Sequence, residues 1–448
     1  MEVYTFVPYV SVALSLALQG LTLIYVSPTS YKRAFALPVI LLPVAITYFT
    51  AEYASAIGIC NVFIAVEFSS MFAVEVFDNV CLSKKSYAPA VQAQLKKDDD
   101  AKARGKHFVS KWNALWDKAC WSLDIAVNKR RINRVDQARN IPYFDSKRPH
   151  YYPSRRNFLL FRTTRFVLLY LLLDFVMSQP LEDAQVKFAP GKERIFARIL
   201  ERDIVPAELG EIFGILVGQA ICYYGTLLAG YDFLSLVSVG LCMGNVSDWR
   251  PLFGDIREVY TIRTFWRTFW HQQLLRPLES TASFITHSLL RLPRITRIEG
   301  ISISKPRLEQ KILYLLSSYT TLTLIFLISG IAHIISDRMI GIPYRDTRIV
   351  SLFLSQAVGI MFEDAGRWIY RCVTGSKREG PVKIWHRVVG YAWLVVFALW
   401  AVPEWVFSIL RLEEQPVMLP VTFFEKGKGA VRGWQLVDSW MTYLMTES

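Results

Sequence analysis

The chain has 448 residues, of which 52% are hydrophobic, 14% aromatic and only 20% charged. Soluble domains are usually less apolar and more highly charged, so this composition argues against a chain of two or three soluble domains. The net charge of +13 would suit nucleic-acid binding, but no zinc-finger spacing or helix-turn-helix pattern accompanies it. We therefore expect an all-α, multi-pass membrane protein that does not bind nucleic acid.

Several apolar stretches approach or exceed the length of about 20 residues that a helix needs to cross a bilayer. They predict eight or nine transmembrane helices in a single membrane domain, residues 1–448. The expected segments are 6–26, 35–51, 56–77, 158–178, 210–229, 231–246, 312–336, 349–371 and 387–410.

Two long basic stretches, 82–156 and 247–308, separate these segments. In the first, apolar residues recur at helical spacing from Trp112 to Val127, which predicts an interfacial helix lying on the membrane. Because cytosolic loops carry an excess of Lys and Arg, charge places both stretches in the cytosol.

Counting helices conflicts with this placement. Two full crossings between 210 and 246 would put the second basic stretch in the lumen. We give the charge bias more weight, and infer that one segment is re-entrant or that the two share a single crossing. Irregular backbone at membrane depth is tolerated where it lines a cavity. Four glycines make a break plausible: Gly225, Gly230, Gly240 and Gly244.

His333 lies in the apolar run 315–336. An ionisable group at that depth is costly and usually has a function, and imidazole can transfer a proton near neutral pH. The alternative is a buried histidine satisfied by a neighbouring helix. Asp337, one turn later, either holds the imidazole tautomer or is a charge at the helix end near the membrane surface, and the second interpretation is favoured.

A second histidine, His271, follows an amphipathic pattern that begins at Ile262. The apolar residues of this pattern lie on one side of the expected helix, which would run to Leu274, while Arg263 and Arg267 lie on another. His271 at the end of this helix can point into a polar pocket. An interfacial aromatic belt explains the same composition equally well.

The third group of polar residues lies in the apolar stretch 356–367. Gln356, Gly359, Glu363 and Arg367 share one helix face, which could line a polar tunnel, and Asp364 lies beside them. An ion pair between Glu363 and Arg367 is the simpler explanation of these two charges. The chain contains no nucleophile elbow, P-loop, dinucleotide-binding fingerprint or zinc-protease motif, and we expect no bound metal and no permanently bound cofactor.

Three blocks together resemble a known family. They are Trp249-Arg250-Pro251 to Gly254 followed by Phe265-Trp266-Arg267 and Trp270-His271-Gln272, then Ser329 to His333, then Gln356 with Glu363-Asp364. In this order, within the part 230–410, they resemble the membrane-bound O-acyltransferases of the wax-synthase branch, especially fungal members that acetylate terpenoid or polyketide alcohols. The usual Trp-Pro pair of the first block appears here as Trp249-Arg250-Pro251.

The resemblance implies a reaction inside the membrane between an acyl-CoA from the cytosol and a hydrophobic alcohol. By similarity His333 is the catalytic general base, and His271 positions the acyl carbonyl or stabilises the developing oxyanion. We expect contacts with CoA from Arg263, Trp266, Arg267, Trp270 and Arg276, with help from the basic loop 82–156. We expect the substrate tunnel to be lined by Ser329, Gln356, Glu363 and Asp364.

The closer resemblance to fungal secondary-metabolism enzymes favours acetyl-CoA and a hydroxylated terpenoid. A wax-ester or sterol-ester synthase that uses long-chain acyl-CoA is the alternative. A small-molecule transporter would also explain intramembrane Glu, Asp and His. It predicts an internal repeat in the pattern of apolar segments, however, and this sequence shows no such symmetry. We expect the protein in the endoplasmic reticulum membrane, as a monomer or a homodimer.

Overall fold

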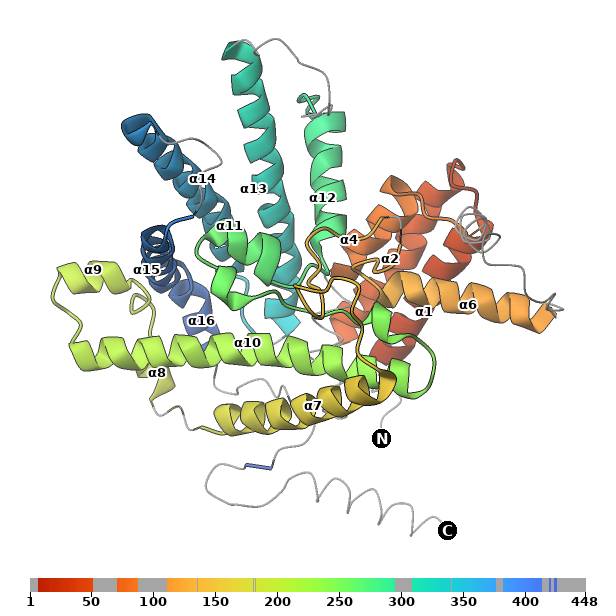
Figure 1. The fold of residues 1–448 in the computed structure, drawn as a ribbon, viewed down its shortest axis with the longest axis horizontal. Coiled ribbons are helices and arrows are strands. Elements are labelled where there is room, and N and C mark those ends of the chain that lie inside the picture. Colours follow the sequence, from red (N-terminus) through yellow and green to blue (C-terminus); the bar gives the residue numbers. More distant parts are fainter. Residues whose placement is uncertain are drawn as a thin grey trace. The chain divides into compact units, whose positions relative to one another are not determined.

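The computed structural model of the chain describes residues 7–50, 71–87, 111–134, 136–179, 181, 183–294, 308–339, 341–375, 382–412, 419 and 423–424. Every regular element in these residues is a helix, as the sequence predicts (Figure 1). The described residues fall into two compact units. The first unit comprises those up to Ala138 and from Gln273 to Met339, and the second comprises those from Arg139 to Gln272 and from Gly341 onward.

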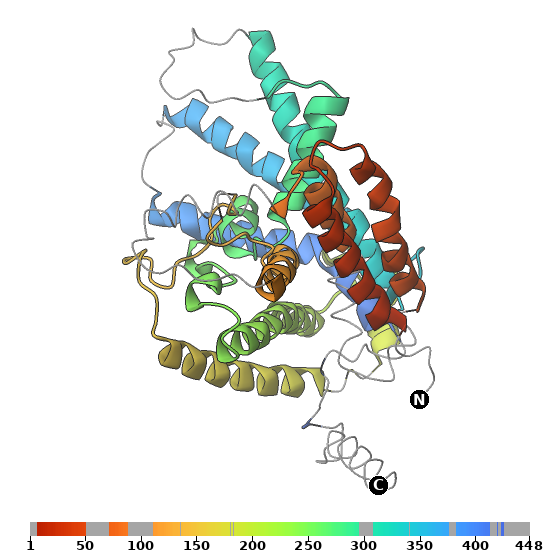
Figure 2. The same ribbon diagram turned by 90° about the vertical axis from the view of Figure 1, so that its right-hand side faces the viewer.

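The first unit contains the N-terminal helices. Helices α1 (Val7–Tyr25) and α2 (Lys32–Thr50) lie side by side (Figure 2). Helix α4 (Met71–Phe77) continues into the π-helix η4 (Asp78–Leu82), and α6 (Lys111–Val127) packs against α1. The helix predicted between Trp112 and Val127 is thereby confirmed. Its position on a membrane surface stays a prediction.

The same unit contains the helix that carries His333. Helix α12 (Leu275–Ser283) continues into the π-helix η8 (Phe284–Leu289) and packs beside the long helix α13 (Leu308–Met339). Helix α13 includes the whole apolar segment predicted at 312–336, and its apolar length explains why it forms one uninterrupted helix.

The second unit is built around two long helices, α7 (Arg155–Met177) and α10 (Pro206–Gly240), which lie side by side in Figure 1. The Ser154 hydroxyl caps the first turn of α7, and proline, which suits a helix start, begins α10. The short helices α8 (Ala184–Lys187) and α9 (Ile195–Leu200) lie between them in the sequence. Two further short elements, η5 (Val246–Asp248) and η6 (Ile256–Glu258), follow α10.

Helix α10 corrects the prediction of two separate membrane segments at 210–229 and 231–246. It is one continuous helix of 35 residues, so a break at Gly225 or Gly230 is wrong. Gly225 serves packing instead, because a Cβ there would lie 2.7 Å from Leu173 Cδ2 of α7. At 1.5 Å per residue the helix is about 50 Å long, longer than one crossing needs. One continuous helix agrees with the alternative that the two segments share a single crossing, which would remove the conflict between helix counting and charge and stays a prediction.

The second unit ends in three helices, α14 (Ile349–Thr374), α15 (Ile384–Ala401) and α16 (Pro403–Leu410). Gly375, in the left-handed conformation at φ 63°, follows α14 and stops it. Pro403 separates α15 from α16, since proline has no N–H group to continue a helix.

Among the described residues, four helices are long and apolar enough to span a membrane: α10, α13, α14 and α15. This finding agrees with a multi-pass membrane protein, but the predicted number of eight or nine crossings is not confirmed. Most of the predicted segment 56–77 lies outside the described residues.

The close approach of α14 to its neighbours generates a test of the packing. A Cβ at Gly359 would lie 2.5 Å from Ile262 Cδ1 and 2.8 Å from Phe397 Cε2. Because neither buried side chain can move cheaply, we expect Gly359→Ala to destabilise the protein by about 1–3 kcal/mol. The measurement is the midpoint of thermal unfolding in detergent.

Gly366, in the same helix, provides the control. Apart from its chain neighbours and the backbone of α14 itself, no heavy atom of the described residues lies within 4 Å of a Cβ added there. Alanine is also favoured over glycine inside a helix by about 0.5–1 kcal/mol. Gly366→Ala should therefore keep or raise the midpoint. Equal midpoints for Gly359→Ala and the wild-type protein would contradict the packing described here.

Candidate active site

The segment from Ile262 to His271 forms a shorter and wider helix than its sequence pattern predicts. The Thr261 hydroxyl accepts a hydrogen bond from Thr264 N (2.9 Å) at the start of helix α11 (Ile262–Thr264). The chain then continues as the π-helix η7 (Phe265–Phe269), closed by the 2.8 Å hydrogen bond that Trp270 N donates to Phe265 O. The regular helix predicted to reach Leu274 is therefore wrong, because Trp270 is already extended.

Side-chain contacts explain why the helix ends there. The rings of Phe265 and Trp270 stack with centroids 5.4 Å apart, a geometry that the wide π-turn brings about. The Gln272 side-chain amide donates to the carbonyl oxygens of Trp266 (3.0 Å) and Trp270 (2.6 Å). In a longer helix, backbone N–H groups of the next turn would have bonded these carbonyl oxygens. Gln272 is only 2% exposed, so it is a structural stop for this segment.

His271 lies just beyond this stop, among aromatic rings. Its ring centroid is 5.3 Å from that of Trp270 and 6.2 Å from that of Phe253, and its Nδ1 atom is buried. Gly254 N donates to Phe269 O (2.9 Å), and a Cβ at Gly254 would lie 2.0 Å from Thr268 O. The first motif block therefore packs directly on the segment that leads to His271, at a position that only glycine fits.

Helix α14 contacts the segment from Ile262 to Trp266 through three side chains. Trp266 Nε1 donates to Gln356 Oε1 (3.1 Å), and Arg263 forms an ion pair with Asp364. The Glu363 carboxylate accepts from the backbone N–H of Ile262 (2.5 Å). These contacts bring together residues predicted separately as CoA contacts and as tunnel residues.

Two further predictions concern arginines on or near this segment. Arg367 Nη2 lies 3.2 Å from Glu363 Oε2, so the predicted ion pair is confirmed. The Arg267 side chain is exposed, while its backbone carbonyl accepts from Asn140 Nδ2 (3.2 Å). The contact of Arg267 with CoA stays a prediction.

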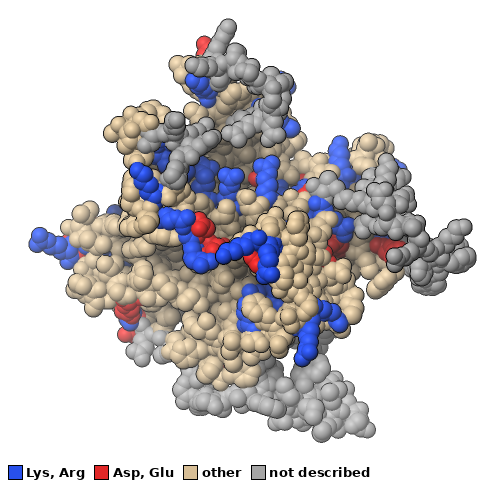
Figure 3. Space-filling view, in the orientation of Figure 1, with Lys and Arg blue, Asp and Glu red and all other residues tan. Residues whose placement is uncertain are grey.

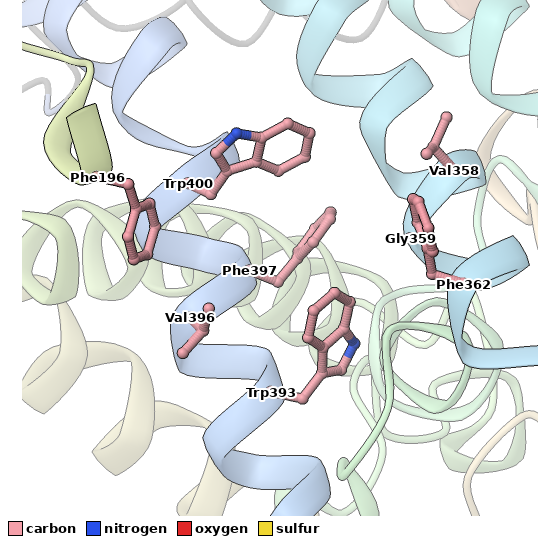
Figure 4. Close-up of a pocket in the computed structure, with 8 residues that line it drawn as sticks. All are labelled: Phe196, Val358, Gly359, Phe362, Trp393, Val396, Phe397 and Trp400. Carbon is pink, nitrogen blue, oxygen red and sulfur yellow. The ribbon is translucent and has the colours of Figure 1, made fainter. Parts of the chain in front are cut away.

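An apolar cavity of about 330 Å³ adjoins this network (Figure 4). It lies between α14 and α15, with one residue from α9, and is lined by Phe196, Val358, Gly359, Phe362, Trp393, Val396, Phe397 and Trp400. Trp393 joins the cavity to the network, since its Nε1 donates to Glu363 Oε1 (3.2 Å). Because its lining is hydrocarbon and aromatic rings, the cavity suits an apolar group and cannot orient a hydroxyl group.

In the first unit, His333 faces the carbonyl of a residue one turn earlier. Its Nδ1 lies 2.6 Å from Ser329 O. A carbonyl oxygen can only accept, so Nδ1 must donate, and the lone pair of the neutral imidazole is on Nε2. The backbone of Ser329 thus fixes the tautomer at Nδ1. Asp337 is only 2% exposed and lies in the last turn of α13, so it is a charge at the helix end, and its position relative to the membrane surface stays a prediction.

Arg276, predicted to contact CoA, belongs to a charged cluster in the first unit. The Asp136 carboxylate pairs with both Lys85 and Arg276. Burial alone would raise the pKa of Asp136, but hydrogen bonds and charge from these two cations outweigh burial and hold the pKa at about 2. Asp136 therefore keeps its negative charge at neutral pH.

Arg131 adds a third cation to this cluster. It is 5% exposed, its Nη2 donates to Asn79 Oδ1 (2.8 Å), and burial lowers its pKa. Its Nη1 is buried and has no hydrogen-bond partner within the described part of the chain. The charges of Asp136, Glu75 and Asp124 partly offset this lowering of the Arg131 pKa, so more than one carboxylate acts on this guanidinium group. Lys and Arg are also more prominent than Asp and Glu on the face shown in Figure 3.

Sequence reasoning missed several of these residues. Lys85, Arg131 and Asp136 carried only a general signal, the positive charge of the loop 82–156. Gln272 was visible in the motif but without a role, and Trp393 carried no signal beyond its apolar surroundings. Lys85, Arg131, Asp136 and Trp393 are placed by partners that are distant in the sequence, and Gln272 by the carbonyl groups at the end of η7.

Comparison with known proteins identifies the family. Residues 249–355 match the Membrane bound O-acyl transferase family. Acetyltransferase ataH of Aspergillus terreus is 31% identical over 322 residues, which cover 69% of this chain and 97% of that protein. The chain belongs to the membrane bound O-acyl transferase family. The resemblance seen in the sequence is confirmed, and an O-acyltransferase is favoured over the transporter interpretation.

Two other relatives cover similar or larger parts of the chain. Acetyltransferase pyr8 of Aspergillus fumigatus is 31% identical over 68% of this chain and 67% of its own length. Acetyltransferase TRI7 of Fusarium sporotrichioides is 26% identical over 89% of this chain and 85% of its own length. No solved structure matches the chain. The stretch matched by the family, 249–355, contains both His271 and His333.

Proposed function

We propose that this O-acyltransferase transfers acetyl from acetyl-CoA to a hydroxyl group of a hydrophobic secondary metabolite, a terpenoid or a related compound, in the endoplasmic reticulum membrane. Support for the acetyl group comes from relatives named acetyltransferases that cover most of this chain. The observation that carries the mechanism is the hydrogen bond from His333 Nδ1 to Ser329 O (2.6 Å). It leaves the basic lone pair on Nε2, as a general base for an alcohol requires.

In this mechanism, Nε2 of His333 takes the proton of the acceptor hydroxyl. The oxygen attacks the thioester carbonyl carbon, the carbon–sulfur bond breaks, and CoA leaves as thiolate. The imidazolium then gives its proton to the sulfur, so the products are the ester and CoA, and no acyl-enzyme forms. His271 donates a hydrogen bond to the oxygen of the tetrahedral intermediate. The rings around His271 fix its orientation for this role.

The charged cluster of the first unit is the candidate contact for the phosphates of CoA. Lys85 and Arg276 carry side chains that are 21% and 19% exposed, so both remain accessible to a ligand. Lys85 and Arg276 together carry two positive charges against the one negative charge of Asp136, and this excess favours a polyanion. Phosphate oxygens would also offer acceptors to guanidinium groups such as that of Arg131.

The function is tested by incubating membranes that contain the protein with acetyl-CoA, longer acyl-CoAs and an extract of the native host. Mass spectrometry then detects an added acyl group, and we expect acetyl. His333→Ala should lower the rate by about 1,000-fold or more because the base is lost. His271→Ala should lower it by about 100-fold because one oxyanion donor is lost.

His150→Ala is the control for these variants, since His150 is exposed in a loop. It should keep the wild-type rate, and all three variants should be present in membranes at equal amounts. Wild-type turnover by His333→Ala would overturn the catalytic assignment. Transfer of long chains in preference to acetyl would favour the wax-ester or sterol-ester synthase instead.

The phosphate contacts can be tested separately from the chemical step. Arg276→Gln and Lys85→Gln should each raise KM for acetyl-CoA about tenfold, because each removes a charged hydrogen bond to phosphate. KM for S-acetylpantetheine, which has no phosphate, should stay unchanged. Arg345→Gln, at a surface pair with an 85% exposed side chain, is the control. An equal rise in KM for both donors would place the phosphates elsewhere.

A further inference from the structure

Glu363 is a buried carboxylate, with a side chain only 5% exposed, in the middle of helix α14. Its oxygens accept from the backbone N–H groups of Ile262 (2.5 Å) and Arg263 (3.4 Å). They also accept from Trp393 Nε1 (3.2 Å) and Arg367 Nη2 (3.2 Å). The carboxylate therefore points into the protein, toward the start of the segment that leads to His271.

The position of this carboxylate matters because the first amides of a helix have no partner within it. Ile262 and Arg263 are the first two residues of α11, and a negative charge at a helix start is favourable. Helix α11 has three residues and η7 has five, so the segment is too short to be stable alone. The conformation of the segment must therefore be stabilised by its contacts with other parts of the unit, such as α14.

Two further contacts fix the direction of the segment along α14. Asp364 pairs with Arg263, next to the Glu363 contact. Gln356 accepts from Trp266 Nε1 (3.1 Å), about two helical turns away. Contacts this far apart prevent the segment from rotating about its first residue. The far end of the segment, with Trp270 and His271, is then fixed as well.

We propose that Glu363 is a positioning residue for His271 and not a wall of the substrate tunnel. It anchors the first amides of α11 and so sets where the imidazole of His271 lies at the other end of the segment. The inference rests on the proposed acetyl transfer, since it assigns an indirect catalytic effect to Glu363. A shift of about 1 Å in a catalytic group can cost about 100-fold in rate.

A carboxylate elsewhere in the same unit provides a matched control. Asp174 in α7 is 1% exposed, and it accepts from the backbone N–H groups of Phe423 and Phe424. Like Glu363, it is a buried carboxylate bonded to two consecutive amides. Unlike Glu363, it anchors a segment that carries no predicted catalytic residue. Removing either carboxylate should cost stability, but only the loss of Glu363 should affect the chemical step.

The experiment compares Glu363→Leu, Glu363→Gln and Asp174→Leu in the full-length protein in detergent. We expect Glu363→Leu to lower kcat about 100-fold, because His271 loses its fixed position. Glu363→Gln should recover part of kcat, because its amide oxygen still accepts from Ile262 N. If Glu363→Leu does not fold, the kcat of Glu363→Gln still tests the proposal. Asp174→Leu should lower the unfolding midpoint but keep kcat.

A second measurement does not depend on activity. Hydrogen–deuterium exchange of the amides from 262 to 270 should become faster in the Glu363 variants and stay unchanged in Asp174→Leu. Unchanged exchange in the Glu363 variants would overturn the anchoring, as would a kcat loss of equal size in Asp174→Leu. Wild-type protein that transfers no acyl group would refute the proposed function, while the exchange result would still decide whether Glu363 holds the segment.

Discussion

Two backbone amides at the start of α11 place a strong constraint on the second unit. Amides at a helix start have no partner within the helix, and in a membrane protein a buried one cannot rely on water. The Glu363 carboxylate satisfies both, at 2.5 and 3.4 Å. The eight residues that follow from this point are shaped by α14 on one side and by the loop ending at Gly254 on the other. The location of His271 depends on both.

This arrangement separates the chemical members of the motif from its structural members. Gly254 allows a backbone approach to Phe269, and Gln272 bonds the carbonyls left open where the π-helix ends. Gln356 bonds the ring nitrogen of Trp266. These residues are required by packing and by hydrogen-bond satisfaction, although they belong to the same motif blocks as the two histidines or to the block that follows them. Membership of a motif therefore does not by itself assign a chemical role.

The sequence predicted the long helices well because apolar length alone determines them. The segments 312–336 and 349–371 correspond to α13 and α14 with small shifts at their ends. The predictions from the sequence are wrong where contacts with residues distant in the sequence determine the structure. Helix α10 continues through Gly225, where Leu173 of α7 packs closely against it, and the early end of η7 depends on Gln272. Arg276 and Asp136 are 140 positions apart, so no local pattern could reveal their pairing.

The tautomer of His333 explains how one histidine can serve both proton transfers of the proposed reaction. With Nδ1–H bonded to the Ser329 carbonyl, the neutral ring presents its lone pair at Nε2. After it takes the hydroxyl proton, the ring carries a charge that is costly to hold at membrane depth. The departing thiolate is the group that needs this proton. Returning it to sulfur restores the neutral tautomer, because the Nδ1 hydrogen bond is kept throughout, and so no separate acid is required.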